Sequence, residues 1–272
     1  MNKKVGPYHV VDFPPERLAA VAFIRQQWCK RSMYGLLEVD VTDARRHIEE
    51  YKARTGERLS FTGYLVFCLA HAVAEDKAVQ AYMKGRKQLI LFDDVDVGLM
   101  VEHKVGEKRD LMGHVVRGAN RKSYLEVHQD IRAAQAGPVP PGAGMAPWIR
   151  RAMSLPWPVP GLLNAMARMA RRRDPAIFTA RAGTVAITAV GMFGEGRGGW
   201  GIAPTAHALT LVVGGIAWKP AVVQDRIEPR EILHLTVVFN HDVIDGAPAT
   251  RFTRRLVELI ESGYGLNEAQ TQ

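Results

Sequence analysis

His241 has the spacing and the setting of a proton-transfer residue. It lies in the segment N-H-D-V-I-D-G at residues 240–246, with Asp245 four positions later and Gly246 directly after that carboxylate. Histidine changes charge near neutral pH and is the side chain most often used to move protons. A histidine in a turn is more often structural, but the H-x-x-x-D-G spacing favours a chemical role. The segment therefore predicts that His241 takes up and releases a proton in a reaction.

The elements on both sides of His241 follow from apolar periodicity. Residues 232–239 alternate as a β-strand does, and residues 248–262 carry apolar side chains at helical spacing. Gly246 is expected to let the backbone turn tightly between the two. The histidine is thus predicted at the mouth of a strand-to-helix turn.

The rest of the chain alternates between helical and extended patterns. Helices are expected at 17–32, 43–54, 59–74 and 123–135, and strands at 38–41, 184–190, 208–218 and 231–239, with an extended stretch at 88–102. Ser123 and Glu126 form a capping-box pattern, and Gly98 marks a bulge or a close approach of backbone. Strands spaced between helices indicate an α/β layered fold.

Composition agrees with one large α/β domain. The chain has 272 residues, of which 47% are hydrophobic, and no apolar run is long enough to cross a bilayer. The first residues lack the apolar core of a signal peptide, and Cys29 and Cys68 lie in apolar helical patterns, as core-filling thiols do. A cytoplasmic location is therefore expected.

The net charge of +8 suits a phosphate-bearing small molecule, an acidic partner or nucleic acid. The chain has no recognised nucleic-acid motif, so no nucleic-acid partner is expected. The histidines besides His241 show no H-x-x-x-H or H-E-x-x-H pattern, so no metal site is expected. The glycine-rich run at 194–199 lacks the lysine of a phosphate-binding loop and is not interpreted as a nucleotide site.

The segment around His241 resembles the D-H-R-x-x-D-G motif of the dihydrolipoyl acyltransferases of 2-oxo acid dehydrogenase complexes. It is also similar to the H-H-x-x-x-D-G of chloramphenicol acetyltransferase and of condensation domains. Further segments follow the family's order at 37–42, 59–74, 95–101 and 183–194, the last being G-T-V-A-I-T-A-V-G-M-F-G. The resemblance covers about residues 17–136 and 180–262. It implies a chloramphenicol acetyltransferase-like two-layer α/β fold, a mixed sheet with helices on one side, assembled as trimers.

The same resemblance implies roles for individual residues. His241 corresponds to the general base, and Thr188 takes the place of the serine hydroxyl that stabilises the oxyanion, although threonine is also common in strands. The histidine of one subunit would meet the hydroxyl of its neighbour. Asp245 would orient the turn through an ion pair with Arg25 or Arg31. Gly246, His114, Gly191 and Phe193 are expected near the substrate channel. Asn240 and Asp242 depart from the family's motif, which leaves the acceptor open.

A proline- and arginine-rich stretch, at about 137–176, departs from the family pattern as an insertion. Within residues 137–173 it carries seven prolines and six arginines, and residues 162–169 read as a basic amphipathic helix. A lid, a surface for a partner protein, contact with an anionic membrane and an irregular packed insertion are all consistent with it. The D-K-A at 76–78 matches a lipoylation site only by coincidence, because it ends an apolar helix. No lipoyl domain and no bound lipoate are therefore expected in this chain.

The expected activity is acyl transfer between coenzyme A and a thiol acceptor such as dihydrolipoamide. Coenzyme A enters this hypothesis as an acyl-CoA substrate, with a homotrimer or a multiple of it as the working unit. One alternative is an acyltransferase that modifies the hydroxyl or amine of a small molecule, as chloramphenicol acetyltransferase does. The other is a non-catalytic trimeric scaffold, which would have no need of His241, Thr188 and Asp245 together.

Overall fold

A computed structural model describes residues 21, 31–85, 87–105, 108–137, 151, 155, 159–190 and 196–266. The described helices are α2 (Thr42–Thr55), α3 (Phe61–Glu75), α4 (Tyr124–Ala136), α6 (Val159–Arg173), α7 (Ala176–Ala182) and α8 (Gly246–Glu261), with short 3₁₀ turns η1 (Lys77–Gln80) and η2 (Ala119–Arg121). The strands are β1 (Ser32–Asp40), β2 (Tyr82–Lys84), β3 (Gln88–Ile90), β4 (Val97–Val105), β5 (Lys108–Val116), β6 (Val185–Ala189), β7 (Leu209–Val223) and β8 (Arg226–Asn240). Within these ranges, no helix is both long and apolar enough to span a membrane.

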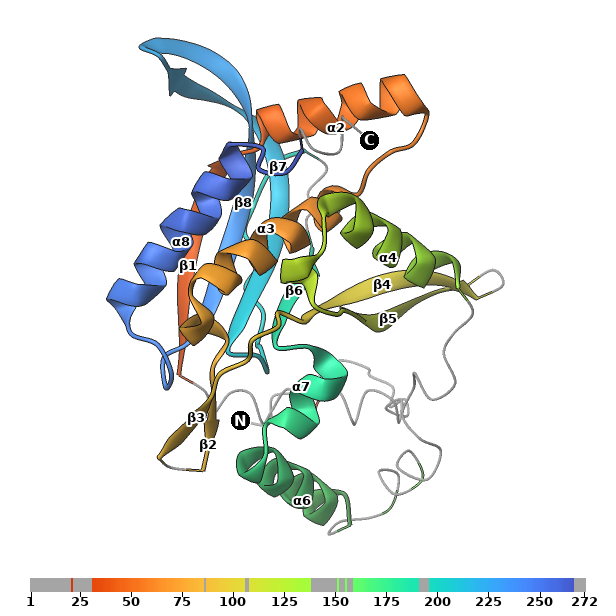
Figure 1. The fold of residues 1–272 in the computed structure, drawn as a ribbon, viewed down its shortest axis with the longest axis vertical. Coiled ribbons are helices and arrows are strands. Elements are labelled where there is room, and N and C mark those ends of the chain that lie inside the picture. The colour runs from red at the N-terminus through yellow and green to blue at the C-terminus, as the bar shows by residue number, and fades with distance from the viewer. Residues whose placement is uncertain are drawn as a thin grey trace, which may run out of the picture.

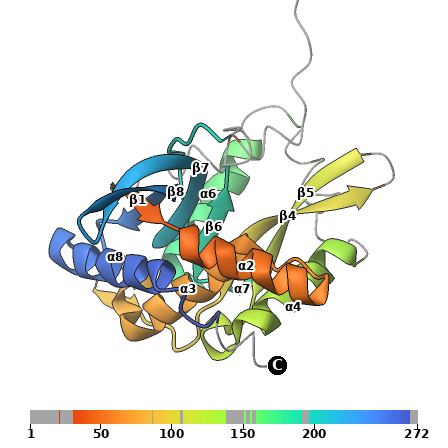
Figure 2. The same ribbon diagram turned by 90° about the horizontal axis from the view of Figure 1, so that it is seen from above.

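The main sheet is mixed. Its six strands run in the order β1-β8-β7-β6-β4-β5, and β2 pairs with β3 in a separate hairpin. The pairs β4–β6 and β6–β7 are parallel, whereas β1–β8, β8–β7 and β4–β5 are antiparallel. The helices α2, α3, α4 and α8 cover one face of this sheet (Figures 1 and 2). The predicted layered fold, with a mixed sheet and helices on one side, is confirmed.

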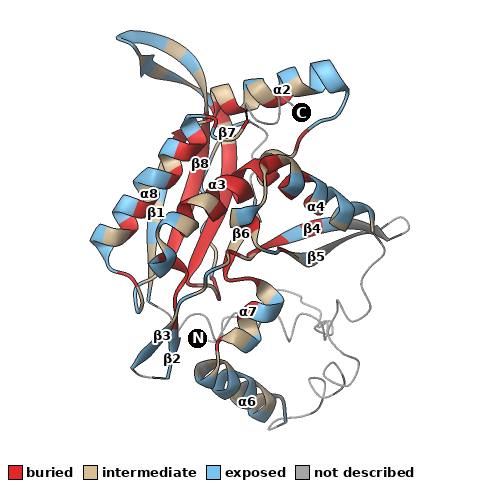
Figure 3. Ribbon diagram, in the orientation of Figure 1, coloured by how far each residue is buried: buried red, intermediate tan, exposed pale blue. Residues whose placement is uncertain are grey.

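The core lies between the sheet and these helices. Alternate residues of β8 (Leu233, Leu235, Val237 and Phe239) belong to it, so the residues between them face the other side of the sheet. Helix α3 is buried along most of its length, as its apolar sequence predicts (Figure 3). Cys68 is fully buried and free within this helix, and burial raises the pKa of its thiol to about 12. A core-filling role for Cys68 is confirmed, and Cys29 lies outside the described residues.

Local signals predicted two helix ends correctly. Ser123 and Glu126 form the reciprocal capping box that opens α4. Gly56 ends α2 in the left-handed conformation, with its N–H donating to the carbonyl of Lys52. The extended stretch expected at 88–102 divides into β3 and the start of β4.

Part of the second face of the sheet, over β7 and β8, is covered by the chain itself at residues 196–207, which we term the crossing segment, whereas Leu36 and Met100 on the same face are exposed. Trp200 Nε1 donates to the carbonyl of Leu37 at 2.9 Å, and the N–H of Gly215 donates to the carbonyl of Gly199 at 2.9 Å. His234 on β8 is therefore buried although it faces away from the helices, with the ring of Trp200 at a centroid distance of 4.5 Å from its own.

Two parts of the chain project from this two-layer body. The hairpin of β7 and β8 extends past the sheet at its upper end in Figure 1, and α6 with α7 lies at the opposite end. Most of α6 is exposed (Figure 3).

Candidate active site

His241 lies in the turn between β8 and α8, as its segment predicts. Its backbone N–H donates to the carbonyl of Arg31 at 2.7 Å, which ties the turn to the start of β1. The carbonyl of Asn240 accepts hydrogen bonds from Val243 at 3.0 Å and Ile244 at 3.3 Å. The main chain around the histidine is thus fixed on both sides, while its side chain remains 46% exposed. This arrangement presents an accessible imidazole on a rigid support.

The carboxylate of Asp245 lies near the histidine but does not form a hydrogen bond with it. The Oδ1 atom is 3.8 Å from Nδ1 of His241, and the Asp245 side chain is 88% exposed. Asp245 also occupies the N-cap position of α8, where a negative charge interacts favourably with the helix dipole.

The expected ion pair between Asp245 and Arg31 is not formed. Arg31 Nη1 instead lies 3.6 Å from Oδ1 of Asp242, because Asp242 is the carboxylate on the β1 side of the turn. The other candidate partner, Arg25, lies outside the described residues. The guanidinium of Arg31 therefore partly balances the negative charge that Asp242 adds beside the histidine. The sequence did not predict this ion pair.

Thr188 lies on β6, on the sheet face opposite the helices, because its neighbours Val185 and Ile187 belong to the core. It pairs with Val212 of β7, whereas the N–H of Asn240, just before His241, donates to the carbonyl of Ala208. At a rise of about 3.3 Å per residue and a strand spacing of about 4.8 Å, Thr188 and His241 lie roughly 20 Å apart. One protomer therefore does not bring the two side chains together.

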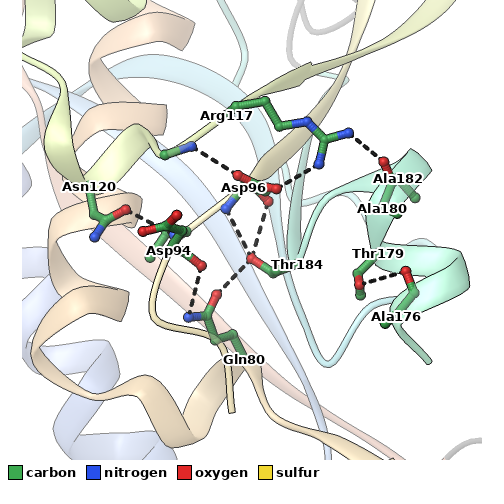
Figure 4. Close-up of polar contacts among 12 residues, drawn as sticks. Gln80, Asp94, Asp96, Arg117, Asn120, Ala176, Thr179, Ala180, Ala182 and Thr184 are labelled. Atoms are coloured by element: carbon green, nitrogen blue, oxygen red, sulfur yellow. Dashed lines mark hydrogen bonds and ion pairs between the residues drawn. The ribbon is translucent and has the colours of Figure 1, made fainter. Parts of the chain in front are cut away.

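A polar network fixes the start of β6, four residues before Thr188 (Figure 4). The Thr184 hydroxyl donates to Oε1 of Gln80 at 2.7 Å and accepts from the N–H of Asp96 at 3.1 Å. The Tyr82 hydroxyl donates to the carbonyl of Thr184 at 2.9 Å. Since Thr184 and Tyr82 are buried, these bonds hold β6 firmly against the chain that leads into β4.

The same network reaches helix α7. Asp96 accepts from Arg117 Nη1 at 2.6 Å and from the N–H of Gly118 at 2.9 Å, and Arg117 also donates to the carbonyl of Ala180 (Figure 4). His207 of the crossing segment contacts the carbonyl of Ala182 through Nε2 at 3.0 Å. The position of Thr188 thus depends on contacts between segments far apart in sequence, which no local pattern could reveal.

His114 does not share a surface with Thr188. It lies opposite Leu99 of the core in the β4–β5 pair, so its side chain is on the helix side of the sheet. There its Nε2 atom is 3.6 Å from Oδ1 of Asp130 on α4. His114 thus has a structural contact on the helix side, and its substrate contact stays a prediction. Gly191 and Phe193 lie outside the described residues, and none of the described side chains form a cluster that could hold a metal ion.

Gly246 is not required by the local backbone, contrary to expectation. It is the first residue of α8, its φ is outside the left-handed region, and a Cβ atom there would meet no atom of the described residues within 4 Å. The tight turn is formed by the hydrogen bonds to Asn240 instead.

We therefore expect Gly246→Ala to keep or slightly raise stability. Removing the freedom of glycine in the unfolded chain is worth about 0.4–1 kcal/mol where alanine fits the native backbone. The thermal midpoint, followed by circular dichroism at fixed protein concentration, measures the effect. A drop equivalent to more than about 1 kcal/mol would show that the glycine does serve the turn.

Comparison with known proteins identifies the family to which the chain belongs. The model of the family described as 2-oxoacid dehydrogenases acyltransferase (catalytic domain) matches residues 24–137 and 145–266. The succinyltransferase component of the mouse 2-oxoglutarate dehydrogenase complex is 23% identical over 229 residues, which cover 82% of this chain and 42% of that protein. The chain thus spans less than half the length of this relative.

Solved structures support the fold. The dihydrolipoamide acetyltransferase of Azotobacter vinelandii superposes with a TM-score of 0.65 at 20% identity, covering 97% of this chain and 98% of that one. A chloramphenicol acetyltransferase structure reaches a TM-score of 0.50 at 12% identity, with 93% and 96% covered. The predicted chloramphenicol acetyltransferase-like fold is confirmed.

Proposed function

Because the chain belongs to the 2-oxoacid dehydrogenases acyltransferase family, we propose that it transfers an acyl group between coenzyme A and a dihydrolipoamide-like thiol. The observation that carries this proposal is the exposed imidazole of His241 on a turn whose main chain is fixed from both sides. Coenzyme A is a substrate here, and its phosphates suit a chain of net charge +8.

The proposed reaction needs one base and one oxyanion donor. His241 removes the proton of the acceptor thiol, and the thiolate attacks the thioester carbonyl of acyl-CoA. The hydroxyl of Thr188 of the partner subunit donates a hydrogen bond to the resulting oxyanion. Collapse of the intermediate breaks the bond between the carbonyl carbon and the coenzyme A sulfur, which takes the proton back from His241. The same steps in reverse load coenzyme A from an acylated lipoyl thiol.

The separation of Thr188 and His241 within one protomer supports a site shared between subunits, as in a trimer. A hydroxyl roughly 20 Å from the base cannot act on the same carbonyl, so the two must come from different chains if both act. Asp245 would then hold the imidazole through its charge, from the Nδ1 side, and leave Nε2 for the proton transfer.

The projecting β7–β8 hairpin offers a surface for this assembly. The cross-strand pairs Pro220–Pro229 and Val222–Ile227 place their side chains, with Trp218, on one face of the ribbon. Trp218, Val222 and Ile227 are all exposed in the single chain, Ile227 by 78%. A contiguous apolar face of this kind is typical of a subunit interface.

We accordingly expect Ile227→Asp to convert the assembly to a smaller species and to lower acyl transfer in parallel, because a carboxylate would be buried without a partner. Sedimentation velocity measures the mass. Gln224→Asp makes the same charge change in the exposed turn of the hairpin, where the residue already has a φ of 47°, which aspartate tolerates. Equal masses for wild type and Ile227→Asp would show that this face is not the interface.

The activity itself is tested by incubating the protein with a panel of acyl-CoAs and dihydrolipoamide. Chromatography with mass detection must follow free coenzyme A and S-acyl-dihydrolipoamide, because the number of thiols does not change in the reaction. Formation of both products at equal rates supports the proposal. Transfer only to hydroxyl or amine acceptors would favour the small-molecule acyltransferase, and no turnover with any acceptor would favour the scaffold.

A further inference from the structure

Helix α6 exposes an apolar stripe that the fold does not use. Leu162, Met166 and Met169 are 63%, 60% and 57% exposed. Their spacing of four and then three residues places them on one face of the helix, and Val159 begins the same row. Long apolar side chains at this spacing are typical of a helix face that packs on another apolar surface.

The surroundings of this stripe are strongly basic. Between residues 151 and 182 the sequence contains six arginines and a single acidic residue, Asp174. Arg168, Arg173 and Arg181 are exposed, whereas the carboxylate of Asp174 accepts the N–H of Ala176 at 3.0 Å at the start of α7. The region therefore combines an apolar stripe with exposed cations: Arg168 lies on another face of α6, and Arg173 continues the row of the stripe at the end of the helix.

The helix is placed where a flat surface can reach it. It lies at one end of the molecule, beyond the sheet and the helices that cover it (Figure 1), and is coloured mostly as exposed in Figure 3. Ile177 of the adjoining helix α7 is also exposed.

We propose that α6 binds the surface of an anionic lipid bilayer, with Leu162, Met166 and Met169 in the acyl-chain boundary and the arginines at the lipid headgroups. An amphipathic helix with a basic polar face is suited to lie in that interface. A second copy of the chain is a poorer occupant, because pairing α6 with itself would bring arginines against arginines. The inference goes beyond acyl transfer and does not depend on it.

The test is co-sedimentation of the full-length protein with lipid vesicles. One set is phosphatidylcholine alone, and the other contains about one quarter phosphatidylglycerol. We expect binding to the anionic vesicles, weakened by added salt, and little binding to the neutral ones. Leu162→Glu with Met166→Glu should lower the affinity at least about tenfold, because two carboxylates would have to enter the acyl-chain boundary.

Arg54→Glu is the matched control. It changes the net charge by the same amount at an exposed position near the end of α2, far from α6 (Figure 1), and should bind as wild type does. A second variant, Arg168→Gln with Arg173→Gln, leaves the apolar stripe intact and should lower binding to the anionic vesicles by roughly tenfold or more. It keeps the test valid if the glutamate variant fails to fold.

Several results would overturn the proposal. Sedimentation no greater with anionic than with neutral vesicles excludes it directly. Unchanged binding of the Leu162 and Met166 double variant would mean that the apolar stripe is not inserted, as with a purely electrostatic contact to an acidic protein or polyanion. Equal losses in that variant and in Arg54→Glu would mean that overall charge, and not α6, governs the binding.

Discussion

Replacing His241 by alanine is expected to lower the rate of acyl transfer by a hundredfold or more, the usual order of magnitude for loss of a positioned general base. The fold should survive. The hydrogen bonds that hold the turn come from backbone atoms, including the N–H of residue 241 that donates to Arg31, and alanine retains all of them. The rate of S-acyl-dihydrolipoamide formation and the thermal midpoint, measured on the same preparation, separate the loss of chemistry from unfolding.

His47→Ala is a suitable control for this experiment. His47 lies on α2, where its Nδ1 atom contacts the carbonyl of Asp43 at 2.8 Å, and it has no part in the proposed site. Its rate should stay close to that of wild type. If His241→Ala retained a similar rate, His241 would not be the base and the catalytic interpretation of the turn would be wrong.

Because Thr188 and His241 lie far apart within one protomer, a mixture of two single variants tests whether they act together across a subunit interface. Each of His241→Ala and Thr188→Ala should be impaired alone. Trimers refolded from a mixture of the two should regain part of the activity, because some interfaces then pair an intact histidine with an intact hydroxyl. If mixed trimers of normal mass recovered no activity, His241 and Thr188 of neighbouring subunits would not form one catalytic site.

The features predicted correctly from sequence are those encoded locally. The alternation of 232–239, the helical spacing of the following residues and the H-x-x-x-D-G segment between them sufficed to place His241 in a strand-to-helix turn. The Ser123 and Glu126 capping box is local in the same sense, since four consecutive residues contain both of its hydrogen bonds. Such patterns need no knowledge of which segments meet in space.

The features that sequence analysis missed depend on register and on contacts between distant segments. Arg31 lies near Asp242 because β1 pairs with β8 and begins beside the turn, which the arginine's own position in sequence does not show. The β4–β5 register puts the side chain of His114 on the helix side of the sheet, which motif order does not show. Gly246 looked like a turn glycine because it ends the motif, yet its backbone is helical.

Gly98 shows how strongly one such distant contact is required. It lies on β4 opposite Ala186 of β6, and a Cβ atom at this position would be 2.1 Å from the carbonyl oxygen of Ala182. That oxygen belongs to the backbone at the end of α7, so no side-chain rotation can make room. The close approach predicted at this glycine from its place in an extended stretch is confirmed.

Gly98→Ala is therefore expected to destabilise the protein by about 3 kcal/mol, at the upper end of the usual cost of overpacking. The end of α7 would have to move away from β4, and it leads directly into β6, which carries Thr188, so acyl transfer should fall together with stability. Urea denaturation at one fixed subunit concentration measures the change, because an oligomer's stability depends on concentration.

Gly113→Ala supplies the control within the same sheet. Gly113 lies on β5, opposite Met100 of β4, and an added Cβ atom there meets none of the described residues within 4 Å. Its substitution should leave the urea midpoint and the acyl-transfer rate nearly unchanged. If both alanine variants behaved alike, the packing of β4 against the end of α7 would not be a determinant of the site. A selective effect of Gly98 would instead tie the position of Thr188 to a contact between segments more than eighty residues apart in the chain.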